Sequence, residues 1–176
     1  MPAELNDTVA GFIARQRHFY LATANARGEP YVQHRGGPAG FLRVLDAATL
    51  AFADFAGNRR YVTVGNLGEN ANVFLFLMDY PSRRRLKIKG TAEISSDPAL
   101  ARALAPGAPD APGAPDAYDA VVERAIVIRV SHWETNCDAH ITARWTAEEI
   151  ETMRAPLEAR IRELETRLRA AGLDPS

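Results

Sequence analysis

The chain of 176 residues has little of several features that would mark its class at once. It contains one cysteine, Cys137, so an internal disulfide is impossible. Its formal net charge is −1, which leaves no overall basic field of the kind that attracts nucleic acid. Its longest strongly apolar run, residues 73–78, is far too short for a membrane-spanning helix. We therefore expect neither nucleic acid nor a membrane as a partner.

The N-terminal residues 1–7 lack the basic start and apolar stretch of a signal peptide. With the single cysteine, this favours a cytoplasmic protein. Apolar residues make up 47% of the chain and charged residues 24%, so one ordinary hydrophobic core is expected.

Short apolar segments separated by turn formers dominate the chain. The segments that predict strands are residues 18–24, 31–35, 41–45, 50–55, 72–79, 86–95 and 125–133. Turn residues at 25–30, 46–49 and 80–85 join neighbouring strands as hairpins. Many short strands with few helices between them predict a mainly β fold, an antiparallel β-barrel with peripheral helices.

Helical spacing of apolar residues occurs near both ends. Residues 5–16 predict a short helix capped by Asn6 or Asp7, and residues 61–67, 99–104 and 118–124 predict shorter helical pieces. A long C-terminal helix starts with Thr146 and Glu149, which fit a capping box. Its apolar residues Ile150, Met153, Leu157, Ile161, Leu164 and Leu168 follow spacings of three and four. Pro156 is expected to interrupt and kink this helix.

A Pro/Gly/Ala segment at residues 105–117 contains Ala-Pro-Gly-Ala-Pro-Asp twice in tandem. Proline and glycine oppose a regular element, so a flexible surface loop inside one domain is expected. We expect that domain to span residues 1–145. Residues 146–171 then form an amphipathic helix, part of the same domain or of a dimer interface.

A basic glycine turn, Gly57-Asn58-Arg59-Arg60, follows the apolar strand segment that ends at Phe55. Arginine offers charge-assisted, bidentate hydrogen bonds to phosphate, and glycine allows close approach of the backbone. The alternative is a turn with solvated arginines, and the residues alone do not separate the two. Asp54 lies inside the apolar segment, where a carboxylate needs a partner.

The order of these elements resembles the pyridoxamine 5′-phosphate oxidase-like flavoproteins, which share the FMN-binding split β-barrel. The resemblance covers residues 12–95 and 125–142. It is carried by His34-Arg35-Gly36-Gly37, by residues 52–59, by Asn66-Leu67 and by residues 84–90. It implies an FMN-binding split barrel and a homodimer with its cofactor site at the interface.

The resemblance also implies which residues contact the cofactor. The strand around His34 should run along the flavin, Asn58 and Arg59 should grip its phosphate, and Arg85 should reach the flavin of the partner subunit. Arg35 and Arg85 are candidates for stabilising negative charge on the reduced flavin. The full expected set is Gln33, His34, Arg35, Ala53, Asp54, Gly57, Asn58, Arg59, Asn66, Arg85, Asn136 and Cys137.

Two departures separate this chain from the vitamin-specific oxidases. They carry a longer apolar run with Arg and Lys where this chain has Arg35-Gly36-Gly37-Pro38, and a substrate-phosphate region that has no match here. We therefore expect an FMN-dependent oxidoreductase acting on a small-molecule redox substrate. The alternative is a non-catalytic flavin, deazaflavin or haem binder on the same barrel.

No catalytic residue or metal site is assigned. Hydride transfer to a flavin requires no general acid or base, because the cofactor itself carries the chemistry. His132, Cys137 and His140 match no strong zinc spacing, so no metal is expected. A Cys137–His nucleophilic pair is a weaker alternative, since it would need an orienting third group and an oxyanion hole.

Overall fold

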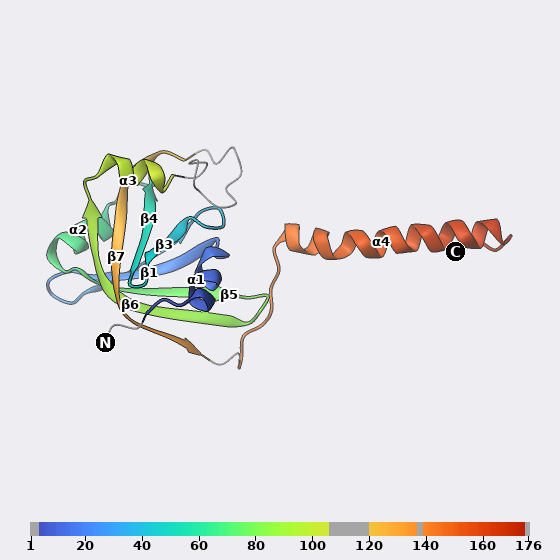
Figure 1. Cartoon of the computed structure of the whole chain (residues 1–176), viewed down its shortest axis with the longest axis horizontal. Helices are drawn as coiled ribbons and strands as arrows, with labels where there is room; N and C mark the ends of the chain where they lie inside the picture. Colours follow the sequence, from blue (N-terminus) through green and yellow to red (C-terminus); the bar gives the residue numbers. More distant parts are fainter. Residues whose placement is uncertain (1–3, 106–119, 137–138, 175–176) are drawn as a thin grey trace. The chain divides into compact units, whose positions relative to one another are not determined.

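The computed structural model describes residues 4–105, 120–136 and 139–174 (Figure 1). Their helices are α1 (Asp7–Ala14), α2 (Val62–Glu69), α3 (Pro98–Ala103) and α4 (Ala147–Ala170). Their strands are β1 (His18–Ala24), β2 (Pro30–Gly36), β3 (Leu42–Asp46), β4 (Thr49–Phe55), β5 (Asn72–Asp79), β6 (Arg84–Ser95) and β7 (Val122–Asn136).

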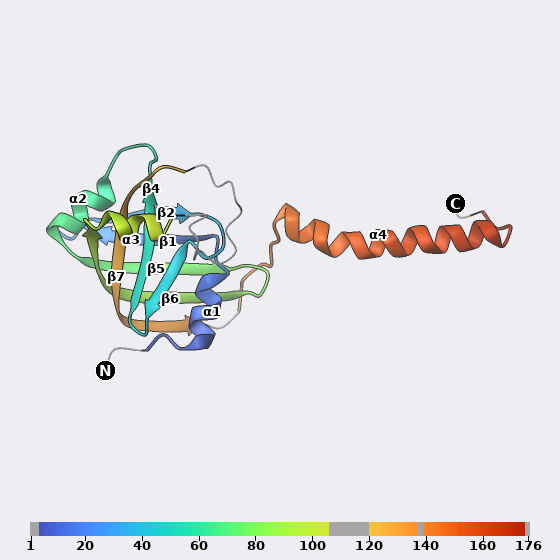
Figure 2. The ribbon, with the colours of Figure 1, turned by 45° about the horizontal axis from the view of Figure 1, so that its top comes forward.

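All the strands of this part of the chain belong to one antiparallel sheet, in the order β2-β1-β5-β6-β7-β4-β3. β4 and β7 run across the direction of β1 and β5, so the sheet folds over on itself (Figures 1 and 2). Among the described residues no ladder joins the outer strands β2 and β3. The mainly β barrel with peripheral helices is confirmed, in a form that hydrogen bonding does not close.

The main hydrophobic core lies between the folded halves of the sheet. Alternate residues of each strand face it, as in β5, where Leu75 and Leu77 are buried while Phe74 and Phe76 are half-buried on the other face. Helix α1 adds Val9, Phe12 and Ile13. Its N-terminus is fixed by the Asn6 side chain, whose Oδ1 accepts a hydrogen bond from the Val9 backbone at 3.0 Å.

Between Lys89 and Gly90 the register of β6 and β7 shifts by one residue, which leaves Ser131 of β7 unpaired as a bulge that bends its strand. A Cβ atom on Gly90 would lie 2.2 Å from the Arg129 carbonyl oxygen, so only glycine permits this approach of the two backbones. Because of this bend, the long strands β6 and β7 take part in both halves of the folded sheet (Figure 1).

One expected helix is wrong. Residues 118–124 were expected to be helical, but Val122, Glu123 and Arg124 form the first part of β7 and pair with the end of β4. The expected loop at residues 105–117 lies almost wholly outside the described residues. The expected strands and hairpins are confirmed, with ends that differ from the expected ones by at most three residues.

The structure divides into two compact units. The barrel unit comprises Met1–Asp79 and Arg84–Ala139, and the second unit comprises Tyr80–Arg83 and His140–Ser176. Within the second unit the guanidinium of Arg144 lies 4.9 Å from the centre of the Tyr80 ring. The capping box at Thr146 is confirmed, and α4 continues through Pro156 without the expected interruption. Across the described part of the chain, no helix is long and apolar enough to cross a membrane.

Candidate functional site

The basic turn leads from β4 into α2. Two of its positions have backbone conformations that favour glycine, yet other residues occupy them. Arg59 and Tyr61 adopt left-handed conformations, with φ of 57° and 50°. The Asn58 side chain closes the turn by accepting a hydrogen bond from the Arg60 backbone at 3.2 Å. Tyr61 precedes α2 and supplies no side-chain cap. The first turn of α2 therefore presents backbone N–H groups that no capping side chain covers.

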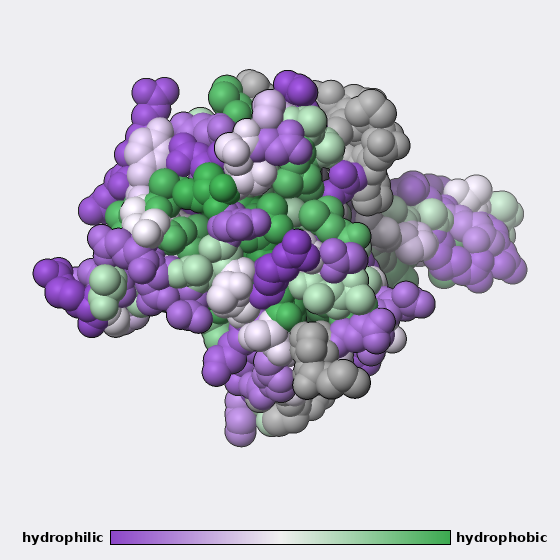
Figure 3. All heavy atoms as spheres, turned by 60° about the vertical axis from the view of Figure 1, so that its left-hand side comes forward, coloured by the Kyte–Doolittle hydropathy of each residue, from purple (hydrophilic) through white to green (hydrophobic). Residues whose placement is uncertain are grey.

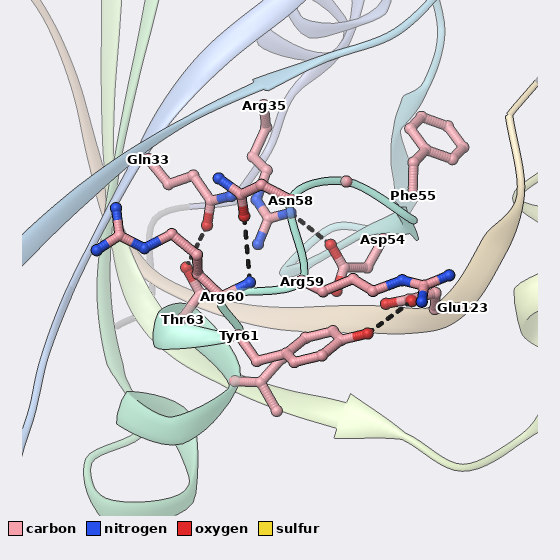
Figure 4. A pocket seen from close by; sticks show the side chains of 12 residues that line it. Gln33, Arg35, Asp54, Phe55, Asn58, Arg59, Arg60, Tyr61, Thr63 and Glu123 are labelled. Carbon is pink, nitrogen blue, oxygen red and sulfur yellow. Dashed lines mark hydrogen bonds and ion pairs between the residues drawn. The ribbon is translucent and has the colours of Figure 1, made fainter.

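A pocket of about 120 Å³ lies at this turn (Figure 4). It is lined by Gln33, Arg35, Asp54, Phe55, Gly57, Asn58, Arg59, Arg60, Tyr61, Thr63, Val64 and Glu123. Three arginines face two carboxylates there, so the lining is net positive. In Figure 4 the two arginines of the turn leave in opposite directions, Arg59 toward Glu123 and Arg60 away from it. The structure thus brings together β2, the end of β4, and the start of α2.

The carboxylate of Asp54, which lies in an apolar strand, is paired with two arginines. Its side chain is only 5% exposed, and its Oδ1 pairs with Nη1 of Arg35 from β2. Its Oδ2 lies 3.6 Å from Nε of Arg124 on β7. One buried carboxylate therefore holds two arginines from different strands.

A second polar group beside the pocket was missed by the sequence analysis. The Tyr61 hydroxyl donates to Oε1 of Glu123 at 2.9 Å, and Nη2 of Arg124 lies 2.7 Å from Oε2 of the same carboxylate. The Arg124 guanidinium also stacks 5.0 Å from the centre of the Tyr61 ring. Donation to the Glu123 carboxylate raises the pKa of Tyr61. These contacts tie the start of α2 to β7.

Gln33 and Asn66 are both expected cofactor contacts, and both form hydrogen bonds that join α2 to the sheet. Gln33 lines the pocket, and its Oε1 accepts a hydrogen bond from the Thr63 hydroxyl at 2.7 Å. Asn66 is buried on α2 and donates to the Thr23 hydroxyl of β1 at 3.0 Å. Both bonds fix α2 against the sheet, and Asn66 does not line the pocket.

Three further expected residues, Ala53, His34 and Arg85, do not line the pocket. Ala53 is buried in a small second core cluster. His34 is exposed on the opposite face of β2 from Gln33 and Arg35. Arg85 lies on β6, where its backbone faces Met78 on one side and Asn136 on the other. Cys137 lies outside the described residues.

Two buried nitrogens have no hydrogen-bond partner in the described part of the chain, and both belong to expected site residues. They are Nε of Arg35 and Nε of Arg85. A buried N–H without a partner is costly, so such a group in a native protein commonly awaits a ligand or water. This observation supports the choice of these two arginines more directly than the sequence did.

Gly57 is expected to let a ligand approach the backbone, and its conformation and surroundings bear on that expectation. Gly57 has no positive φ, and a Cβ atom built on it would meet nothing within 4 Å. The fold itself therefore does not require glycine at this position. The space beside Gly57 is open toward the pocket that it lines, which fits close approach of a ligand to the backbone.

His34 forms a ring cluster on the outer face of the sheet instead. Its imidazole stacks on that of His18 with centres 5.6 Å apart, and the Tyr20 ring meets both edge-on. Partial burial, and to a smaller extent the charge of His34, lowers the pKa of His18. The lowered pKa of His18 makes the stability of this outer face depend on pH near neutrality.

We expect the free energy of unfolding to fall as the pH decreases from about 7.5 to 5.5. Because the pKa of His18 is lower in the folded chain, the unfolded chain binds more protons in this window. Urea unfolding across the window should show a shallower pH dependence for His18→Gln. His34→Gln should flatten the curve less, since burial is the larger cause. An unchanged slope in His18→Gln would contradict the assignment.

Metal binding finds no support in the residues that the structure covers. Within residues 4–105, 120–136 and 139–174, no group of three or more His, Cys, Asp or Glu side chains could hold an ion. The arrangement at the basic turn instead suits an anion, because three arginines and the uncapped start of α2 line one pocket there.

The fold is a curved, split antiparallel barrel, and its candidate site is an arginine-lined pocket at the end of β4. Together they define the structural class of this protein. The family model described as pyridoxamine 5′-phosphate oxidase matches residues 5–137. The chain therefore belongs to the pyridoxamine 5′-phosphate oxidase family. A search of curated proteins gave no match.

Solved structures of the same fold have low sequence identity. HupZ of Group A Streptococcus superposes with a TM-score of 0.55 at 19% identity, covering 79% of this chain and 98% of that one. A candidate pyridoxamine 5′-phosphate oxidase from Listeria innocua gives 0.52 at 16% identity, covering 75% and 98%. Another from Lactobacillus delbrueckii gives 0.51 at 20% identity, covering 75% and 94%. At these identities the likeness concerns the fold alone.

Proposed function

We propose that this protein is an FMN-dependent oxidoreductase whose pocket at the basic turn holds the cofactor phosphate. The observation that carries the proposal is one pocket whose lining includes Arg35, Arg59 and the uncapped start of α2. A phosphate monoester is a dianion with several acceptor oxygens, which matches guanidinium and backbone N–H donors. Membership of the family supports a flavin as the group that carries this phosphate.

Each residue of the pocket has a separate proposed role in binding the phosphate. Asn58 shapes the turn, Arg59 supplies an exposed guanidinium, and Gly57 leaves the backbone open. Asp54 holds Arg35 in a fixed position in the lining of the pocket. The phosphate would thus meet donors already fixed by the fold, which lowers the entropy lost on binding.

When bound, the flavin supplies the hydride chemistry, and the protein supplies position and charge. Arg35 and Arg85 are proposed to place positive charge near the ring, because each has a buried N–H without a partner. Positive charge there would favour the anionic, reduced form of the ring over the neutral, oxidised form. No general acid or base is assigned to the chain.

We also propose a homodimer that uses the outer face of the sheet. Aromatic side chains of β1 and β5, among them Tyr20, Phe74 and Phe76, remain partly exposed on this face. Figure 3 shows hydrophobic side chains gathered within a hydrophilic border on the face that it displays. Apolar side chains that gather at the surface commonly mark an interface.

The proposal is tested by identifying the small molecule that the purified protein releases on denaturation. FMN in the mass spectrum, or a yellow complex formed on adding FMN to colourless protein, is the expected result. A deazaflavin in its place would keep the phosphate site and change the cofactor. Protein that is colourless and fails to bind added FMN would contradict the proposal.

A non-catalytic flavin carrier is the second candidate, favoured by one feature of the pocket. Its two carboxylates, Asp54 and Glu123, are both engaged in contacts with neighbouring arginines or with Tyr61. This arrangement fits a rigid binding site as well as a site of turnover. Bound flavin that neither NADH nor NADPH reduces, nor any small reduced substrate, would favour the carrier.

A further inference from the structure

Helix α4 carries a long apolar stripe that is exposed. The stripe consists of Ile150, Met153, Leu157, Ile161, Leu164 and Leu168, which are 38–65% exposed. A helix with such a stripe normally buries it, because exposed apolar area is unfavourable in water. The stripe therefore points to a partner surface of matching length.

The spacing within the stripe limits the geometry of that partner. The steps between successive members are three, four and four residues, then three and four again, so the pattern repeats every 11 residues. A period of 11 residues follows the turn of an α-helix more closely than a heptad does. The stripe hence stays nearly straight along α4 and can meet a second straight helix over its whole length.

The helix is well formed without help from the stripe. Thr146 and Glu149 form a complete capping box at its start. Ion pairs within the helix follow on its polar sides, such as Arg154 with Glu158 at 2.8 Å and Arg169 with Glu165 at 3.6 Å. The stripe is thus left as a contact surface on a helix that is already ordered.

We propose that the stripe is an interface for α4 of a second copy of this chain, in a parallel, in-register pair. In that arrangement each stripe residue meets its own counterpart, so all six layers are apolar. Residues that flank the stripe contact the partner about five positions further along. Glu149 then faces Arg154 of the partner subunit, and Arg160 faces Glu165 of the partner subunit. Two-fold symmetry doubles both complementary pairs.

The flanking charges disfavour the opposite direction. An antiparallel pair centred to fill the whole stripe would bring Arg160 against the partner's Arg160. On the other flank it would bring Glu158 against the partner's Glu158. Like charges in such flanking positions oppose pairing. The same antiparallel pair would also bring Arg154 near Glu165 of the partner subunit, so its flanks combine attractive and repulsive contacts. The parallel pair has only complementary contacts at the positions next to the stripe, and it is therefore the favoured one of two arrangements with similarly apolar layers.

Disulfide trapping in the full chain tests both the pairing and its direction. Ile150→Cys and Leu168→Cys place a thiol at either end of the stripe, and oxidised glutathione serves as the oxidant. In the parallel pair each variant should form a covalent dimer in dilute protein, since the two thiols lie side by side. In an antiparallel pair the same thiols would be about 27 Å apart along the axis and could not join.

Ala159→Cys is the matched control, because its position lies on the opposite side of α4 from the stripe. Peptide mapping of the oxidised dimers separates the engineered link from any link through the native Cys137. Covalent dimers at both ends, with little at Ala159→Cys, support the proposal. Absence of a link at either end overturns it. Flavin content measured in the same samples keeps this result separate from the cofactor assignment.

Discussion

Replacing Asp54 with alanine is expected to lower the free energy of unfolding by about 3–5 kcal/mol. The Asp54 side chain is 5% exposed and is the shared partner of Arg35 and Arg124. Without it, two largely buried guanidinium groups from different strands lose their counter-charge and repel each other. Breaking a buried ion pair from one side is costly for this reason, even where the intact pair adds little net stability.

The measurement is urea unfolding followed by fluorescence of Trp133 in a Trp145→Phe background, which reports on the barrel unit. Glu134→Ala is the matched control, because Glu134 pairs with Lys87 at 2.9 Å but is half exposed. Removal of such a surface pair is expected to cost no more than about 1 kcal/mol. Equal midpoints for the two variants would show that Asp54 is not the buried counter-charge inferred from the structure.

The barrel could be predicted because its strands are joined by turns whose chemistry is local. The segments around residues 25–30, 46–49 and 80–85 contain Gly, Pro, Asn, Asp or Ser, and each connects the strands on either side in the structure. The capping residues Asn6 and Thr146 are equally local signals, and both are confirmed. Local turn and cap chemistry was therefore enough to specify most of the fold.

The site could be predicted only in part, since its partners come from distant segments. The sequence showed that Asp54 needs a counter-charge, but Arg124 is supplied by a strand far along the chain. Residues 118–124 were misread as helical because their strand character depends on pairing with β4. That error concealed Glu123 and its bond to Tyr61. Contacts made by sheet pairing leave no local pattern in the sequence.

Replacing Arg59 with alanine is expected to weaken FMN binding by roughly ten- to hundredfold, since a charge-assisted contact to phosphate contributes about 1.5–3 kcal/mol. Arg59 lines the pocket from a left-handed position of the turn, next to the open start of α2. Its guanidinium and the helix N–H groups are proposed to act on the same phosphate. Fluorescence titration of the purified protein, freed of bound flavin, measures the change.

A second ligand and a second variant test whether the loss of FMN affinity comes from the phosphate contact. Riboflavin lacks the phosphate, so its weaker binding should be nearly the same in wild type and Arg59→Ala. Arg60→Ala is the neighbouring control and should lose less, because Arg60 leaves the turn in the opposite direction (Figure 4). If Arg59→Ala weakens FMN and riboflavin equally, its effect is on the pocket as a whole. If FMN affinity is unchanged, the phosphate does not bind at this turn, although the barrel assignment would stand.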